Sequence, residues 1–167
     1  MRDAVGSTWI FGLVISFTLI FSAFLVLALT YAKAYKMKNE MTSIIEKYEG
    51  ITTSDSLNGL GSLKIINQYL VNNNYTATGH CEDGEYGAED LDYNSPSLKA
   101  VTDTERNQKF HYCIDVSTDK KNCTTIYRIT VFYNFTLPVL GNIRQFSISG
   151  QTNEIKNSYF LNKEIEC

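Results

Sequence analysis

The stretch that decides the fold is Ser7 to Ala32, STWIFGLVISFTLIFSAFLVLALTYA, which is twenty-six consecutive residues without a charged side chain. A helix rises about 1.5 Å per residue, so this run makes about 39 Å of helix. The hydrocarbon core of a bilayer is roughly 30 Å thick. The sequence therefore predicts a transmembrane helix over residues 7–32, preceded by a short tail (1–6) and followed by a domain of residues 33–167.

Aromatic residues stand at both ends of the apolar run, with Trp9 near its start and Tyr31 and Tyr35 near its end. Such residues anchor a spanning helix at the two membrane surfaces. The alternative is a cleaved secretory signal, because Thr30, Tyr31 and Ala32 resemble a small-x-small cleavage site. The apolar core of a signal is about 7 to 15 residues long, however. We therefore expect the segment to remain in the mature protein, with the lipid bilayer as a partner.

The composition narrows the class of protein. The chain has 15 Lys and Arg against 18 Asp and Glu, a net charge of −3, and no basic patch, so we expect no nucleic acid partner. Its 11 Tyr and 9 Phe supply apolar material for a core. The chain outside residues 7–32 is therefore expected to form one small globular domain rather than a disordered tail.

All four cysteines lie outside the apolar run, at Cys81, Cys113, Cys123 and Cys167. An even set in a small domain outside the cytosol is typical of disulfides. Cys113 lies in the middle of a predicted strand and Cys123 begins the next one, so the two are out of register in a tight hairpin. We prefer Cys81 with Cys113 and Cys123 with Cys167, and the other two connectivities stay open.

A zinc site is the alternative use of the cysteines, because His80 and Cys81, and His111 and Cys113, form two pairs of metal-binding residue types. Neither pair has the spacing of a known zinc motif, and two cysteines would be left over. We therefore expect no metal and no cofactor. His80 and His111 are the only histidines, and neither lies in a recognisable catalytic motif. We accordingly expect that the protein is not an enzyme.

Two features predict opposite orientations in the membrane. Lys33, Lys36 and Lys38 follow the apolar run directly, and the positive-inside rule would place them and the domain in the cytoplasm. The cysteines favour an oxidising compartment instead. We expect a single-pass protein with a cytoplasmic N-terminus and an extracytoplasmic domain.

The helical pattern continues past the membrane run. Apolar residues recur at intervals of three and four to about residue 49, where Gly50 is a natural C-cap. The members of this stripe are Ala34, Met37, Met41, Ile44 and Tyr48. A second helix is predicted over residues 57–72. The acidic segment Glu82 to Asp92 is interpreted as a solvated loop, with a calcium loop as the alternative.

The second half of the chain alternates apolar and polar residues over 110–116, 127–137 and 144–150. Three such runs with short connections predict an antiparallel meander. We expect the helix stripe to cover its inner face, made by Tyr127, Ile129, Val131 and Tyr133. The predicted fold is α+β: a long N-terminal helix packed on a three- to four-stranded antiparallel sheet.

This layout resembles the architecture of type IV pilins and pseudopilins. The stretch YRITVFYNFTLPVLGNIRQFSISGQTNEI, from Tyr127 to Ile155, is also similar to the ending of TadE-like pseudopilins of tight-adherence pilus systems. The resemblance implies a subunit that takes part in assembling a surface pilus or secretion filament, with other pilin-like subunits or pilus assembly membrane proteins as partners. It also implies Gly6 as a prepilin-peptidase site, although Phe11 stands where such proteins usually carry a Glu.

Gly12 and Ser16 form a small-xxx-small step within the apolar run. Such a step lets two spanning helices approach closely. The competing interpretation of the whole chain is a single-span cell-surface binding or receptor domain without an assembly role.

Overall fold

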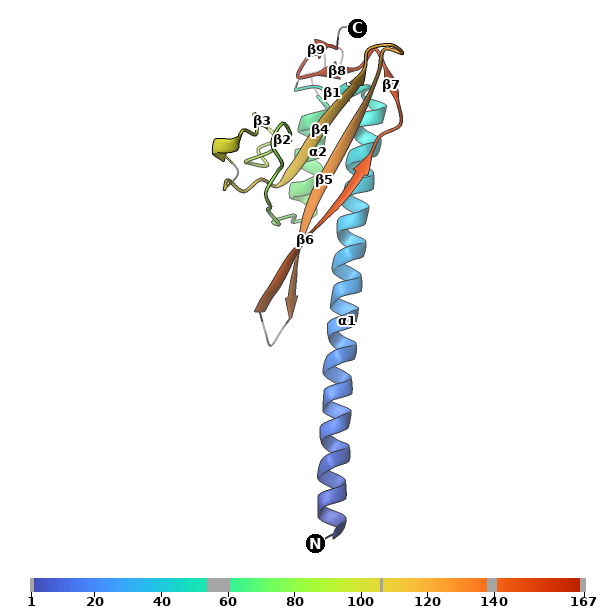
Figure 1. Cartoon of the computed structure of the whole chain (residues 1–167), viewed down its shortest axis with the longest axis vertical. Coiled ribbons are helices and arrows are strands. Elements are labelled where there is room, and N and C mark those ends of the chain that lie inside the picture. The colour runs from blue at the N-terminus through green and yellow to red at the C-terminus, as the bar shows by residue number, and fades with distance from the viewer. Residues whose placement is uncertain (1, 54–60, 106, 138–140, 166–167) are drawn as a thin grey trace.

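A single long helix, α1 (Arg2–Lys47), runs the length of the molecule, and the rest of the chain gathers around its C-terminal half (Figure 1). The structure is a computed structural model that describes residues 2–53, 61–105, 107–137 and 141–165. The 46 residues of α1 make about 69 Å of helix. The predicted helix is confirmed, and it begins earlier than Ser7, at Arg2.

The end of α1 differs in detail from the prediction. The helix ends at Lys47, and Glu49, rather than a glycine, takes the left-handed conformation with φ of 55°. Gly50 follows at φ of 137° and begins strand β1 (Gly50–Ile51). A Cβ atom at Gly50 would lie 2.1 Å from the carbonyl oxygen of Tyr159. Gly50 is therefore required for the close approach of two backbones as well as for the turn.

The predicted meander is present as β4 (Tyr112–Asp119), β5 (Thr124–Leu137) and β6 (Gly141–Gln151), joined antiparallel in that order. Ile114 pairs with Ile129, and Val131 pairs with Ile148. The alternation with period two predicted these strands because one face of each is buried.

The sheet has more strands than the three or four predicted. Strands β2 (Tyr86–Gly87) and β3 (Lys99–Ala100) extend it beyond β4, and β7 (Ile155–Lys156) pairs with β5. A second sheet holds β1, β8 (Tyr159–Phe160) and β9 (Lys163–Glu164), with β1 and β8 parallel. Strands of two residues are too short for alternation to show. A short 3-10 helix, η1 (Asp103–Glu105), follows β3.

The interpretation of the acidic segment as a solvated loop is correct only in part, because β2 lies within it and Gly87 and Ala88 are buried. A Cβ at Gly87 would lie 2.3 Å from the ring of Phe110, so the segment packs tightly against the core. Many of its other residues, including Glu82 and Asp83, are exposed, as expected.

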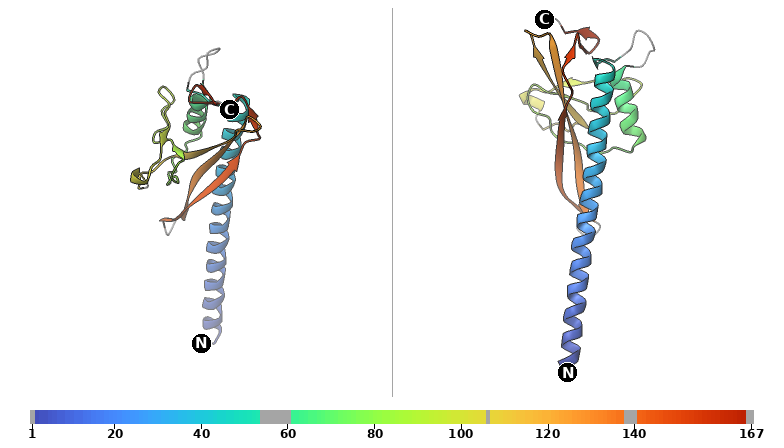
Figure 2. Two further views of the ribbon diagram at one scale, coloured as in Figure 1. Left: turned by 45° about the horizontal axis from the view of Figure 1, so that its top comes forward. Right: turned by 90° about the vertical axis from the view of Figure 1, so that its right-hand side faces the viewer.

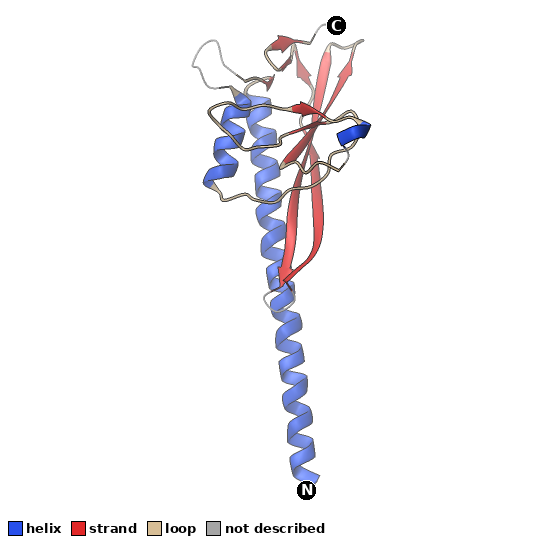
Figure 3. Ribbon diagram, turned by 90° about the vertical axis from the view of Figure 1, so that its left-hand side faces the viewer, coloured by secondary structure: helices blue, strands red, loops and turns tan. Residues whose placement is uncertain are grey.

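Helix α2 (Ser62–Asn72) lies beside α1, and the large sheet lies on one side of this pair of helices (Figure 3). The predicted start of this helix, residues 57–60, lies outside the described residues. Its buried face carries Leu63, Ile66 and Leu70. These residues belong to a hydrophobic cluster that also contains the α1 stripe and the inner face of β5.

The expected stripe on α1 is buried at Ala34, Met37, Met41 and Ile44, whereas Tyr48 is partly exposed. The facing residues Tyr127, Ile129 and Val131 of β5 have no exposed surface. Helix α1 contacts both β5 and β6 along this stretch. The C-terminal half of α1 is therefore part of the domain core.

Candidate functional site

The N-terminal half of α1 projects out of the domain (Figure 2), and its side chains from Thr8 to Ser22 are exposed. Trp9, Phe11 and Ile20 are 75%, 67% and 68% exposed. An exposed apolar surface of this extent marks a membrane or protein contact. The helix is long and apolar enough to cross a membrane, with a mean hydropathy of 2.6 over a stretch that has no buried residue. These properties fit a single-pass membrane anchor.

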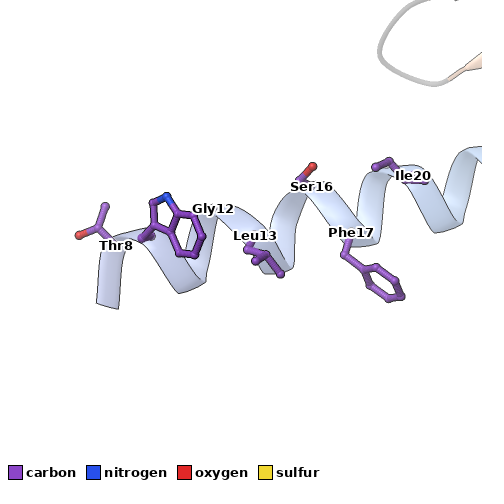
Figure 4. A pocket seen from close by; sticks show the side chains of 7 residues that line it. Thr8, Gly12, Leu13, Ser16, Phe17 and Ile20 are labelled. Carbon is purple, nitrogen blue, oxygen red and sulfur yellow. The ribbon is translucent and has the colours of Figure 1, made fainter. Parts of the chain in front are cut away.

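One face of this exposed half is hollowed around Gly12. A Cβ atom at Gly12 would have no neighbour within 4 Å. Figure 4 shows Ser16 and Ile20 pointing to one side of the helix and Leu13 and Phe17 pointing to another. The structure thus places Gly12 and Ser16 one turn apart at a notch between bulkier side chains. A second helix could approach α1 closely there.

A cluster of aromatic rings lies where α1 passes from its exposed half to its buried half. Tyr31 stacks with Tyr35 at 6.4 Å between ring centroids and meets Tyr133 of β5 edge to face at 6.3 Å. Tyr133 in turn stacks on Phe146 of β6 at 5.3 Å. The Lys38 ammonium lies 4.5 Å from the centre of the Tyr35 ring. These contacts hold β5 and β6 against α1 at the expected membrane surface.

Tyr75 fixes the point at which β5 continues beyond β4. The Tyr75 hydroxyl oxygen lies 2.9 Å from the carbonyl oxygen of His111, and it accepts a hydrogen bond of 2.8 Å from the Phe132 amide. The hydroxyl therefore bridges His111 and Phe132, the residues that would form the next pair of β4 and β5 after Tyr112 and Val131. Burial raises the pKa of the Tyr75 hydroxyl, and a hydrogen bond with the Phe132 backbone partly opposes that shift.

We expect Tyr75→Phe to lower the free energy of unfolding by about 1–3 kcal/mol, because it leaves buried backbone groups of His111 and Phe132 without this partner. Denaturant melts of the full chain in detergent would measure the loss. Tyr93→Phe is the matched control, because Tyr93 is 39% exposed. Equal effects of the two substitutions would contradict the role given to Tyr75.

The predicted disulfide between Cys81 and Cys113 is present, with a Cα–Cα distance of 5.6 Å. It joins the segment before β2 to the buried start of β4. The second predicted pair includes Cys167, which lies outside the described residues, so the pairing with Cys123 stays a prediction.

The histidines of the zinc alternative each contact a backbone carbonyl. His80 Nδ1 lies 3.1 Å from the Gln108 oxygen, and His111 Nδ1 lies 3.2 Å from the Ala77 oxygen. The sulfur atoms of Cys81 and Cys113 are bonded to each other, so in this structure the four residues do not present the ligand set that the alternative requires. Gly6, the residue proposed for processing, lies in the first turns of α1.

Glu85 is a partly buried carboxylate next to the disulfide, and sequence reasoning did not single it out. Its Oε2 accepts a 2.8 Å hydrogen bond from the Glu82 amide. Burial is the largest cause that raises the pKa of the Glu85 carboxyl, and the negative charges of Glu82 and Asp115 add to it. The hydrogen bond from the backbone and the charge of Arg128 act in the opposite direction. Only its position within the acidic run could have suggested it from sequence.

A raised pKa means that the folded state holds the Glu85 proton more tightly than the unfolded chain does. The contribution of Glu85 to stability should therefore decline as pH rises from the ordinary glutamate pKa of about 4.3 through its folded pKa. Glu85→Gln should remove this decline and raise the melting temperature at neutral pH. Glu89→Gln is the control, because Glu89 is exposed and is not among the groups that shift the Glu85 pKa. An unchanged pH profile of melting in Glu85→Gln would contradict this expectation.

No family model, curated protein or solved structure matches this chain.

Proposed function

We propose that the chain is a membrane-anchored pilin-like or pseudopilin subunit that takes part in assembly of a surface pilus or secretion filament. The observation that carries the proposal is the division of α1 into two surfaces. Its first half carries no charged side chain from Ser7 to Ala32 and is exposed from Thr8 to Ser22, and its second half buries Met37, Met41 and Ile45 in the core. A rigid helix of this kind can be a bilayer anchor and also a packing surface for the same helix of other subunits.

The proposed orientation has a cytoplasmic N-terminus and an extracytoplasmic domain. The disulfide between Cys81 and Cys113 supports it, because such bonds persist in oxidising compartments. Lys33, Lys36 and Lys38 remain the evidence for the opposite orientation. Protease added to intact cells should remove the domain, and degradation only after lysis would reverse the proposed topology.

Cross-linking between chains tests the assembly role. Ser16→Cys lies at the notch beside Gly12, and Val14→Cys is the matched control, because at 100° per residue it lies on the opposite face of α1. In membranes, Ser16→Cys should give disulfide-linked dimers, Val14→Cys should give few, and Gly12→Leu added to Ser16→Cys should abolish the dimers. The subunit should also occur in sheared extracellular filaments or in an envelope complex.

The alternative function is a single-span cell-surface binding or receptor domain. Equal cross-linking at both positions, together with a protein that stays a detergent-soluble monomer, would favour it. In either case we propose that the protein is not an enzyme. Processing at Gly6 remains part of the pilin-like proposal, and the mass of the mature N-terminus would test it.

A further inference from the structure

The hairpin of β5 and β6 is longer than the sheet that supports it. Strand β4 pairs with β5 only from Thr124 to Val131, so residues 132–137 of β5 continue with β6 alone. This hairpin end, defined here as residues 132–137 and 141–147, begins beside Tyr75 and Thr78 and runs along α1 toward the N-terminus of the helix, so that its far end passes the rest of the domain (Figures 1 and 2).

Contacts with α1 show how far along the helix the hairpin reaches. A Cβ at Gly150 would touch the Lys38 side chain, and four residues earlier Phe146 stacks on Tyr133, which contacts Tyr31. Four residues of β6, from Gly150 to Phe146, thus run beside seven residues of α1, from Lys38 to Tyr31. Leu137 lies four residues beyond Tyr133, which places it about seven helix residues below Tyr31, near Phe24.

The exposure of α1 supports this position independently. Four residues N-terminal to the buried stripe are partly buried, although the residues between them are exposed. They are Ala23, Val26, Leu27 and Thr30. Their spacing of three and four continues the face of Ala34 and Met37. The hairpin end therefore lies over α1 within the charge-free run.

The length of the charge-free run, residues 7–32, then gives the depth of the hairpin end relative to the hydrocarbon of the bilayer. The run exceeds the hydrocarbon thickness by about 9 Å (39 − 30). Phe24 lies eight residues, or about 12 Å, below Ala32. Even if the whole excess is placed on the domain side, the level of Leu137 lies about 3 Å past the edge of the hydrocarbon, and the residues near Tyr133 lie outside that edge.

We infer that the hairpin end is a second membrane-contacting element, which lies among the phospholipid headgroups beside α1. The inference rests on the proposed function, because it requires α1 to span the bilayer. The headgroup region fits better than the hydrocarbon, because β6 ends the strand order of the described residues and β5 lacks β4 beyond Val131, with the Tyr75 hydroxyl in its place at Phe132. Unpaired backbone groups cost several kcal/mol each in hydrocarbon, whereas water and phosphates satisfy them at the surface.

The chemistry of the hairpin end matches a lipid surface. Phe135 pairs in backbone register with Arg144, and aromatic residues and arginine are residue types that suit a phospholipid surface. No acidic residue occurs in the sequence from Lys120 to Asn153, so no carboxylate from this stretch repels lipid phosphates. The partly exposed Phe135 and Phe146 offer apolar contact area at this surface.

Tryptophan quenching by brominated phospholipids tests the inference on the full chain, with one chain per nanodisc. The chain has one tryptophan, Trp9, so the probe is Phe135→Trp in a Trp9→Phe background. Lipids brominated near the glycerol backbone should quench its fluorescence. Phe160→Trp in the same background is the matched control, an aromatic exchange at a partly buried position in β8. It should lose no fluorescence.

The parent chain separates the two proposals, because Trp9 reports insertion of α1 alone. Quenching of Trp9 without quenching of Phe135→Trp above the Phe160→Trp control would overturn the inference and leave the anchor intact. Absence of Trp9 quenching would overturn both. Quenching of Phe135→Trp that appears only with two chains per disc would show that lipid contact depends on a second copy, and would also overturn the inference. If Phe135→Trp fails to fold, Phe146→Trp on the paired strand takes its place and must meet the same criteria.

Discussion

Met41→Asp is expected to unfold the domain while leaving α1 in the membrane. Met41 has no exposed surface and lies in the cluster that joins α1 to β5. Removing a buried methionine side chain costs about 2–5 kcal/mol. An unpaired carboxylate in the same place adds several kcal/mol or must be protonated. The sum is comparable to the whole stability of a small domain, about 5–15 kcal/mol.

Asn39→Asp is the matched control, because it places the same charge two residues away on an exposed face of α1. Its effect should stay within about 0.5 kcal/mol. Hydrogen exchange of the β5 amides in the full chain in detergent would measure both variants. Similar protection in the two variants would show that α1 does not contribute to the core, and the pilin-like proposal would lose its structural support.

Removing the disulfide with Cys81→Ala and Cys113→Ala is expected to cost about 3–4 kcal/mol, the chain-entropy value for a loop of this length. The two cysteines are 32 residues apart, and the loop between them carries β2 and β3, which are two residues long each. Such short strands contribute few backbone hydrogen bonds of their own. The covalent link therefore supplies much of the constraint on this part of the sheet.

Urea denaturation of the double variant and of each single variant would measure the loss. Each single substitution should cost nearly as much as the pair, because either one breaks the same bond. Ser117→Ala, at an exposed position of β4, is the control. A loss below about 1 kcal/mol in the double variant would contradict a structural role for the bond.

The sequence predicted the elements whose periodicity is long enough to read. Apolar residues recur at intervals of three and four over residues 34–48 and alternate with polar ones over residues 127–137, and these patterns correctly predicted α1 and β5. Their facing sides were predicted correctly except at Tyr48 and Tyr133, which are only partly buried. The same strand assignment argued against only one pair, Cys113 with Cys123, because Cys113 lies opposite Thr130. Cys81 with Cys113 was a preference among the remaining connectivities, and the structure confirms it. Periodicity reports burial of one face, and burial is what packs these elements.

The same reasoning failed where structure depends on contacts between distant residues. Strands β1 and β8 are paired because Gly50 permits a close approach to Tyr159, and two-residue strands carry no periodic signal. Charge predicted a solvated loop at Glu82 to Asp92, but packing against Phe110 drew Gly87 into the sheet. Tyr75 and Glu85 acquire their roles only through partners that the fold brings to them.

The sequence by itself determined an uncharged run of membrane-spanning length, a continuous helix through it and an antiparallel meander, because these depend on local spacing and on the free energy of burying apolar surface. Only the tertiary structure decided how the meander sits on α1. The contacts of Tyr133 with Tyr31 and of Gly150 with Lys38 fix the position of the β5–β6 hairpin along α1. They place the end of the hairpin on the N-terminal side of Ala32. Register between a helix and a strand is set by side-chain packing across the interface, which no single stretch of sequence encodes.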